Sequence, residues 1–324
     1  MSTDRGGLDA LIDGIRARRW RALGRGLSLL EDAAPEAPAL VGRLFPLAGG
    51  AFVIGVTGPP GSGKSTLVRG LARSFRASGR RVGILAVDPT SPYTGGALLG
   101  DRVRMQDLAT DREIFIRSMA TRGAMGGLAP ATRDAVDLLD AAGFDPILVE
   151  TVGVGQDEVD VMRTVDAVVV VTVPGLGDEI QAIKAGIMEI ADVFVVNKAD
   201  RPGVERAVRD LHSALEMAED GSARRPIVKT VASRDEGIEE LRARLEACRE
   251  QLESSDELER RRFDHLRVRI EALLERRVLA ATAAAVDLEA ELHEASRRKE
   301  DPYTLAERLW RTVLARHREA SGES

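Results

Sequence analysis

A short apolar run leads directly into a glycine-rich loop, and together they occupy residues 52–66 with the sequence FVIGVTGPPGSGKST. The loop fits the pattern G-x-x-x-x-G-K-[ST], in which successive backbone N–H groups turn inward around a chain of phosphates. A helix expected from about Ser65 to Ser78 would direct the positive end of its dipole at the same anion. A glycine-rich turn can match this pattern by chance, but a preceding strand and a following helix are the context that confirms it. The sequence therefore predicts a nucleotide-binding α/β protein.

The phosphate loop assigns a role to each of its residues. Lys64 is expected to reach the outer phosphates, and the Ser65 hydroxyl is a candidate ligand of Mg²⁺. The residues expected to hold the phosphates are Gly58, Pro59, Pro60, Gly61, Ser62, Gly63, Lys64, Ser65 and Thr66.

Short apolar runs alternate with helical segments from residue 52 to about residue 232. The strand candidates are Phe52–Thr57, Val82–Val87, Ile114–Ile116, Ile147–Glu150, Ala167–Val173, Val193–Val196 and Ile227–Val231. Runs such as the one at 167–171 are too uniformly apolar for a strand with one wet face, so we expect a mostly parallel sheet with helices on both sides. This is a doubly wound α/β fold, in which ligands bind at the carboxyl ends of the strands.

Helical periodicity flanks the predicted sheet on both sides. Leu8, Leu11, Ile12 and Ile15 form an apolar stripe near the N-terminus, and a longer stripe occupies residues 258–279. Residues 304–307 (TLAE) form a capping-box pattern that predicts the start of a last helix. We expect an N-terminal helical extension over residues 1–48, a nucleotide-binding domain over 49–250 and a C-terminal helical segment over 251–324. The C-terminal stripes must be buried, either against the core of the same chain or against a second subunit.

Composition excludes several classes of function. The formal net charge of −6 argues against a general nucleic-acid-binding surface. The single cysteine, Cys248, cannot form an internal disulfide, which suits a reducing compartment. No stretch approaches a membrane span, and the first residues lack the apolar centre of a signal peptide. We therefore expect a cytoplasmic protein that binds neither nucleic acid nor membrane.

The sixth predicted strand ends in the pattern N-K-x-D, at Asn197, Lys198 and Asp200. Guanine presents N1–H and an exocyclic amine side by side, and the Asp200 carboxylate can accept from both, whereas adenine offers no such pair. Asn197 is placed either to bond the purine's other edge or to steady the phosphate loop, and the Lys198 stem can cover the ring. A solvated turn would also use Asn and Asp here. With the phosphate loop in the same chain, the motif favours GTP over ATP.

The seventh predicted strand continues into a second candidate base contact. Its end carries Val231, Ala232 and Ser233, where a backbone N–H could meet the guanine O6 atom.

Three acidic residues at or after strand ends are candidates for metal binding and hydrolysis: Asp88, Asp101 and Glu150. Glu150 occupies the position where a Walker B carboxylate is expected, and triphosphate-bound Mg²⁺ needs few protein carboxylates. Gly153 follows in the sequence ETVG and can bring its N–H close to a γ-phosphate. For Asp88 and Asp101 a role as a loop residue or helix cap is the alternative.

The residue after Gly153 predicts slow hydrolysis. In Ras-like GTPases a Gln at this position orients the attacking water, but here it is Val154, and Gln156 comes two residues later. We therefore expect a slow intrinsic GTPase that a partner stimulates.

Longer stretches carry a family resemblance. They are VDPTSPYTGGALLGDRVRM at 87–105, SMATRGAMGGLA at 118–129, LVETVGVGQDEVDV at 148–161 and PGLGDEIQAIKAGIMEIADVFVVNKAD at 174–200. Through them the chain resembles the MeaB/ArgK family of GTPases, which is related to the human methylmalonic aciduria type A protein, over roughly residues 50–240. The stretch at 231–233 departs from the family's usual S-A-x guanine loop.

The resemblance implies a P-loop GTPase of the SIMIBI class that acts as a chaperone of an adenosylcobalamin-dependent acyl-CoA mutase, chiefly methylmalonyl-CoA mutase. Such proteins gate cofactor delivery from an adenosyltransferase and protect or reactivate the mutase. The resemblance further implies GTP/GDP and Mg²⁺ as cofactors, with Ser65, Asp88, Asp101 and Glu150 around Mg²⁺ and the phosphates. It makes residues 174–184 a third switch loop with Lys184 as a key contact. It also implies a homodimer formed through C-terminal helices.

Two other classes of function share parts of this pattern. A metallochaperone GTPase of the hydrogenase- or urease-maturation kind would need Cys/His ligand clusters, and the chain has one Cys and four scattered His residues. An ATP-dependent kinase linked to basic amino-acid transport conflicts with a guanine-binding Asp200.

Overall fold

The computed structural model describes residues 5–88, 107–108, 110–120, 128–151, 162, 164–175, 190–218 and 225–321. It divides into two compact units, residues 1–262 and 263–324.

The first unit is built on a seven-stranded sheet in which every strand pair is parallel. The strands are β1 (Val53–Thr57), β2 (Val82–Asp88), β3 (Ile114–Ala120), β4 (Ile147–Thr151), β5 (Ala167–Thr172), β6 (Val193–Val196) and β7 (Ile227–Lys229). Their order is β3-β2-β4-β1-β5-β6-β7, so β1 is the central strand. All seven predicted strands are present, and the doubly wound fold is confirmed.

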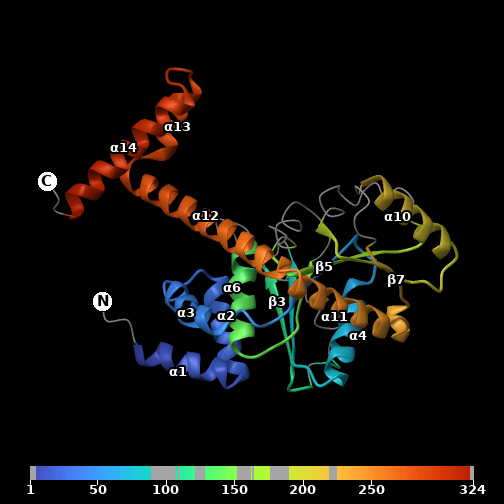
Figure 1. The fold of residues 1–324 in the computed structure, drawn as a ribbon. Helices are drawn as coiled ribbons and strands as arrows, with labels where there is room; N and C mark the ends of the chain where they lie inside the picture. The colour runs from blue at the N-terminus through green and yellow to red at the C-terminus, as the bar shows by residue number, and fades with distance from the viewer. Residues whose placement is uncertain are drawn as a thin grey trace. The chain divides into compact units, whose positions relative to one another are not determined.

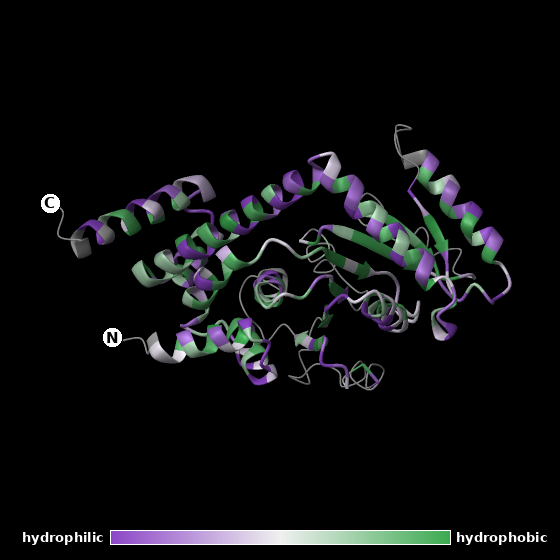
Figure 2. Ribbon diagram, turned by 60° about the horizontal axis from the view of Figure 1, so that its bottom comes forward, coloured by the Kyte–Doolittle hydropathy of each residue, from purple (hydrophilic) through white to green (hydrophobic). Residues whose placement is uncertain are grey.

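Strands β1, β4, β5 and β6 are buried along their whole length. In β5, Val168 and Val170 belong to one buried cluster, whereas Val169 and Val171 belong to the other. This is the period-two alternation of a strand between two apolar layers, and Figure 2 shows the strands in the colour of hydrophobic residues. The uniformly apolar runs of the sequence therefore correspond to strands with an apolar layer on each face, whereas the edge strand β7 is partly exposed.

Helices form both covering layers (Figure 1). The first layer contains α1 (Arg5–Arg16), α2 (Trp20–Glu31), α3 (Ala37–Leu44), α6 (Leu128–Ala141) and α10 (Val204–Ala218). The second contains α4 (Lys64–Ala77) and α11 (Ile238–Ser254). The described part of this unit also contains two short 3-10 turns, η1 (Phe45–Leu47) and η2 (Ala232–Arg234).

The N-terminal helices are part of the core. Their stripe residues Leu11, Ile12 and Ile15 are buried in the same cluster as the sheet and α6. On α2 the buried Glu31 forms an ion pair with Arg117 of the edge strand β3. These contacts fix α1–α3 on one face of the sheet.

Helix α12 (Glu257–Ala285) begins in the first unit and continues into the second, which also holds α13 (Leu288–Ser296) and α14 (Pro302–Ser321). Within the second unit Arg308 of α14 forms ion pairs with Glu291 at 2.6 Å and Glu300 at 2.8 Å. In the part of the chain that the structure describes, no helix has the length and apolarity that a membrane span would need.

The predicted start of the last helix was wrong by about one turn. Asp301 is the capping residue, because its Oδ1 accepts from the N–H groups of Tyr303 at 2.9 Å and Thr304 at 3.1 Å. Pro302 takes the first helical position, where its missing N–H costs nothing. Thr304 therefore lies inside α14, and the capping-box pattern at 304–307 is coincidental.

The second unit leaves many large apolar side chains exposed. They are Phe263, Leu266, Val268, Ile270, Leu273, Leu274, Val278, Leu279, Leu292, Tyr303, Trp310 and Leu314. Among the described residues of this unit, the buried apolar ones are Ala285, Leu305 and Leu309. A surface of this kind is typical of a protein interface.

Candidate nucleotide-binding site

The phosphate loop follows β1, between the carboxyl ends of β4 and β5. Gly58 has φ +141°, and a Cβ atom there would stand 2.1 Å from the carbonyl oxygen of Val171. Gly63 has φ +93°, and its Cβ would stand 2.4 Å from Nδ2 of Asn197. Both positions therefore require glycine, for backbone conformation and for space.

Lys64, the first residue of α4, is buried within the loop. Its Nζ donates to the carbonyl oxygens of Gly58 at 2.7 Å and Pro59 at 3.1 Å. The loop's own carbonyls thus hold the ammonium group that the sequence predicts to reach the outer phosphates. A primary amine with three donors can exchange such carbonyls for phosphate oxygens.

Ser65 and Glu150 are brought into direct contact. The Ser65 Oγ donates to Glu150 Oε1 at 2.6 Å, and the two residues are 7% and 5% exposed. This pairing follows from the sheet, because Glu150 on β4 lies in register with Val56 on β1. A hydroxyl and a carboxylate oxygen together match the hard-oxygen preference of Mg²⁺, so the residues present fit that ion.

The residues that follow Glu150 on β4 and Val56 on β1 are also hydrogen-bonded to each other. Thr151 Oγ1 donates to Thr57 Oγ1 at 3.2 Å, and both side chains are buried. The hydroxyl pair joins the end of β4 to the end of β1 beneath the phosphate loop.

The other predicted metal and hydrolysis residues are less well described. Asp88 is the last residue of β2, in register with Ala120, so its backbone lies at the carboxyl edge of the sheet, and its side chain is outside the described residues. Asp101, Gly153 and Lys184 also lie outside the described residues, as do Val154 and Gln156, and their roles stay predictions.

Asn197, immediately after β6, connects three loops through one buried amide. Its Nδ2 donates to the carbonyl of Ser62 at 2.8 Å. Its Oδ1 accepts from the Ala232 N–H and the Thr230 hydroxyl, both at 3.1 Å. Of the two roles the sequence left open for Asn197, these contacts belong to the one that steadies the phosphate loop.

Lys198 adds a second link to the phosphate loop. Its backbone is left-handed, with φ +58°, and its Nζ donates to the carbonyl of Gly61 at 2.6 Å. The long side chain therefore extends from the end of β6 to the phosphate loop, which is consistent with a stem that covers a bound base.

Asp200 and the loop after β7 stand next to each other. The Ala199 N–H donates to Thr230 at 3.0 Å, and Asp200 Oδ2 lies 3.2 Å from Nη2 of Arg234. The N–H groups of Val231 and Ala232 are bonded to Glu236 and Asn197. The structure thus brings three segments together: the phosphate loop (58–66), the N-K-x-D segment (197–200) and the loop after β7 (230–234). Ser65 and Glu150 lie at the same edge of the sheet.

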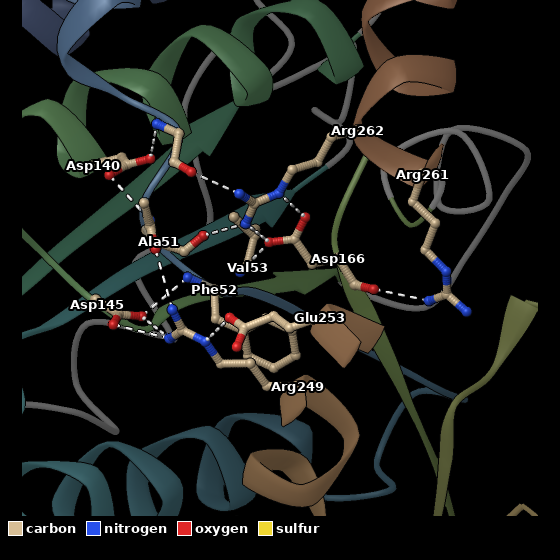
Figure 3. Close-up of polar contacts among 12 residues, drawn as sticks. Ala51, Phe52, Val53, Asp140, Asp145, Asp166, Arg249, Glu253, Arg261 and Arg262 are labelled. Atoms are coloured by element: carbon tan, nitrogen blue, oxygen red, sulfur yellow. Dashed lines mark hydrogen bonds and ion pairs between the residues drawn. The ribbon is translucent and has the colours of Figure 1, made fainter. Parts of the chain in front are cut away.

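The opposite edge of the sheet holds a cluster of charges that the sequence reasoning missed (Figure 3). Asp140 accepts from the N–H groups of Gly49 at 2.6 Å and Ala51 at 3.1 Å. Asp145 and Asp166 accept from the N–H groups of Phe52 at 3.0 Å and Val53 at 2.9 Å. Burial raises the pKa of Asp140, and its two backbone donors partly offset that effect. These carboxylates fix the entry of the chain into β1.

Arginines from α11 and α12 bind two of these carboxylates and also that of Asp192. Arg249 pairs with Asp145 at 3.0 Å, and Arg262 pairs with Asp166 at 2.8 Å. Arg261 pairs with Asp192, the residue before β6, at 2.9 Å. The hydrogen bond to Asp166 raises the pKa of Arg262. The only sequence signal for this cluster is an Asp placed directly before an apolar strand. That signal does not show which arginine the Asp pairs with.

Among the described residues, no group of three or more His, Cys, Asp or Glu side chains is arranged to hold a metal ion.

Comparisons with known proteins give the family. The family model described as "Methylmalonyl Co-A mutase-associated GTPase MeaB" matches residues 23–287. A Pyrococcus abyssi protein assigned as a GTPase is 45% identical over 314 residues, which are 95% of this chain and 97% of the relative. The Mus musculus methylmalonic aciduria type A homolog is 38% identical over 233 residues, which are 70% of this chain and 56% of that protein.

A solved structure, that of a LAO/AO transport system kinase, shares the fold. It superposes with a TM-score of 0.73 and 27% identity, and the match covers 97% of this chain and all of that one. The phosphate loop, the parallel sheet and the match over most of the chain lead to one conclusion: this chain belongs to the MeaB family of P-loop GTPases.

Proposed function

We propose that this chain is a GTP-dependent chaperone of an adenosylcobalamin-dependent acyl-CoA mutase, with methylmalonyl-CoA mutase as the first candidate client. The observation that carries the proposal is the match to a family model whose description names association with that mutase. The name of the mouse relative, a methylmalonic aciduria protein, supports it. In this proposal the nucleotide state governs cofactor loading from an adenosyltransferase and the protection or reactivation of the mutase.

Guanine is the base that the site residues support. Asp200 carries a carboxylate at the rim of the site, within a loop that Asn197 and Ala199 hold against the loop after β7. A carboxylate held in this way accepts from two adjacent donors, which guanine has and adenine lacks. Lys198 would cover the ring, and the backbone at 231–233 would face the O6 edge.

The phosphates would lie in the loop from Gly58 to Thr66. Lys64 would exchange the carbonyls of Gly58 and Pro59 for phosphate oxygens, and Ser65 and Glu150 would hold Mg²⁺, with Asp88 and Asp101 nearby. When bound, the ion supplies positive charge that offsets the charge developing on the phosphates. Gly153 would contact the γ-phosphate through its N–H.

Hydrolysis is proposed to be slow until a partner binds, because Val154 offers no polar group to orient water. Lys184, in the proposed third switch, would act in the stimulated state. The exposed apolar side chains of the second unit support a homodimer formed through the C-terminal helices.

The test follows GTP hydrolysis by the full chain with each candidate mutase: the enzymes acting on methylmalonyl-, isobutyryl-, ethylmalonyl- and hydroxyisobutyryl-CoA. We expect one of them to accelerate hydrolysis and to co-purify with the chain in a nucleotide-dependent way. The Lys64→Ala chain, which loses the phosphate contact, is the matched control and should show neither effect. Absence of stimulation by every mutase would overturn the proposal.

One alternative has an observation in its favour. The solved relative is named a transport system kinase, and kinases ordinarily transfer a phosphoryl group from ATP. Nucleotide preference separates the two interpretations of the site: a chain that binds ATP more tightly than GTP would support the kinase, and the reverse supports the proposed GTPase.

A further inference from the structure

An exposed ion pair ties the proposed guanine-binding carboxylate to the loop after β7. Nη2 of Arg234 lies 3.2 Å from Oδ2 of Asp200, with side-chain exposures of 60% and 38%. We infer that Arg234 is a specificity-determining positioning residue, which holds the Asp200 carboxylate in the orientation that accepts from guanine. This inference rests on the proposed function, in which Asp200 binds the guanine edge.

The backbone presents Arg234 at a fixed place. Val231 and Glu236 form an antiparallel bridge, with N–H···O distances of 3.0 and 3.3 Å, and this closes a tight loop around the 3-10 turn η2. Asp235, the residue after the turn, has a left-handed backbone with φ +57°. Arg234 is the last residue of that turn, so the closed loop determines the point from which its side chain leaves.

The loop is also anchored to the helix that follows the phosphate loop. Asp235 pairs with Arg73 of α4 at 3.5 Å, and Ser74 of α4 donates to Glu239 at 2.6 Å. At the loop's other end Gly237 has φ +76°, and a Cβ there would stand 2.2 Å from the carbonyl of Lys229. Arg234 thus projects from a loop that is held on both sides, whereas its target Asp200 lies in an exposed turn.

The chemistry of the carboxylate explains what the pair contributes. A free carboxylate turns about its terminal torsion, and only the orientation with both oxygens toward the base accepts from N1–H and the amine together. Each oxygen has two acceptor sites, so Oδ2 can keep Arg234 while it accepts from guanine. Arg234 touches the carboxylate and not the base. It lowers the ordering cost of binding by fixing that torsion beforehand.

Removal of the Arg234 side chain should weaken nucleotide binding modestly, and the loss should depend on the base. An exposed pair contributes up to about 1 kcal/mol, so Arg234→Ala should weaken GDP binding about threefold to fivefold. Inosine diphosphate lacks the exocyclic amine and uses fewer of the carboxylate's acceptor sites. The loss for that nucleotide should therefore be smaller than the loss for GDP.

Arg201→Ala is the matched control for charge. Arg201 is exposed, directly follows Asp200 and forms no ion pair with another described residue. Its removal takes the same charge from the same rim, so any effect that comes only from attraction of the nucleotide's phosphates will appear in both variants. Arg234→Lys, which keeps the charge and one donor, should recover part of the GDP affinity.

Asp200→Asn completes the experiment, because an amide at this position should favour xanthosine diphosphate over GDP. In that background Arg234 has lost its ion pair with residue 200 and keeps the one with Glu236, 3.7 Å away. Adding Arg234→Ala should therefore change xanthosine diphosphate affinity no more than adding Arg201→Ala does. Dissociation constants come from calorimetry on the full chain, with circular dichroism to confirm folding of each variant.

The outcomes separate the two hypotheses. A base switch by Asp200→Asn, together with a GDP-specific loss in Arg234→Ala that vanishes in the Asp200→Asn background, supports the role of Arg234. If Asp200→Asn switches the base but Arg234→Ala binds GDP as tightly as Arg201→Ala does, or more tightly, the inference about Arg234 is wrong and guanine recognition by Asp200 stands. If Asp200→Asn leaves the preference unchanged, guanine recognition fails and the inference fails with it.

Discussion

Arg262 of α12 and Asp166, the residue before β5, form a bidentate contact in which the carboxylate side chain is only 2% exposed. The same arginine donates to the carbonyls of Gly49 at 2.6 Å and Ala51 at 2.7 Å. A single side chain thus joins the second turn of α12 to the starts of two neighbouring strands.

Arg262→Ala should destabilise the first unit, because it leaves the Asp166 carboxylate buried without its cation. Removing one member of a buried pair is costly, and since Arg262 is itself partly exposed we expect a loss of about 2–3 kcal/mol in the free energy of unfolding. Urea denaturation measures it. Arg206→Ala, which breaks an exposed i,i+4 pair with Asp210, should cost less than about 0.5 kcal/mol. Equal losses in the two variants would contradict the assigned role of Arg262.

Asn197→Ala should weaken nucleotide binding even though, in this structure, the amide contacts protein groups. Three hydrogen bonds of about 1 kcal/mol each hold the phosphate loop and the loop after β7 together, so GDP affinity should fall about tenfold or more. Fluorescence titration with a labelled GDP measures this. Thr230→Val removes only one of the three bonds and should have a smaller effect; the opposite ranking would argue against Asn197 as the connecting residue.

Glu150→Gln tests the proposed magnesium site with little change in shape. The amide oxygen can still accept from Ser65, so the fold should persist, but the negative charge is lost. The Mg²⁺ concentration that gives half-maximal GTP hydrolysis should rise about 10–100-fold. Glu113→Gln, on the partly exposed pair with Arg81, is the control and should leave the Mg²⁺ dependence unchanged. An unaltered Mg²⁺ titration in Glu150→Gln would exclude this residue from the metal site.

Cys248 should be unreactive in the folded chain. Burial, together with the nearby charge of Asp192, raises the pKa of its thiol to about 12. A raised pKa keeps the thiol protonated, so at pH 8 only about one molecule in ten thousand carries the reactive thiolate. An aromatic disulfide reagent should therefore modify Cys248 far more slowly in buffer than in urea. Similar rates in the two solvents would show that the site is open.

The exposed apolar side chains of α12 should control the oligomeric state. Leu274→Glu places a charge among Ile270, Leu273 and Val278, and we expect it to convert a dimer into monomers in sedimentation experiments. Glu275→Lys changes the charge of the neighbouring exposed residue and should leave the dimer intact. A wild-type chain that sediments as a monomer would remove the homodimer from the proposal.

The sheet could be predicted almost completely from the sequence, because buried parallel strands carry an apolar signal that depends on few neighbours. The predicted and observed strand ends differ in strands that are buried on one side only. β3 extends from Ile114 to Ala120, beyond the predicted end at 116, since Arg117 and Ser118 continue to pair with β2 although they are polar. Strand β7 ends at Lys229, because the next residues bend to meet Asn197 and Glu236.

Side-chain partners could not be predicted in the same way. The sequence showed that Asp166, Asp192, Arg261 and Arg262 are charged, but not which charges meet, because the paired residues are 69 and 96 positions apart. The same holds for Arg117 and Glu31, 86 positions apart. Motifs gave the site residues because phosphate binding confines its groups to one local loop, whereas these pairs depend on the packing of the whole unit.

The bond between Asn197 and Ser62 spans 135 positions of the chain. The other two partners of the Asn197 amide, in the loop after β7, come 33 and 35 positions later still. The phosphate loop is complete in sequence at residue 66, but its support is not made until the end of β7. During synthesis on the ribosome, the phosphate loop therefore lacks these hydrogen bonds until most of the sheet has been translated. We therefore expect the nascent chain to bind nucleotide late in synthesis, after the sheet is complete and not before.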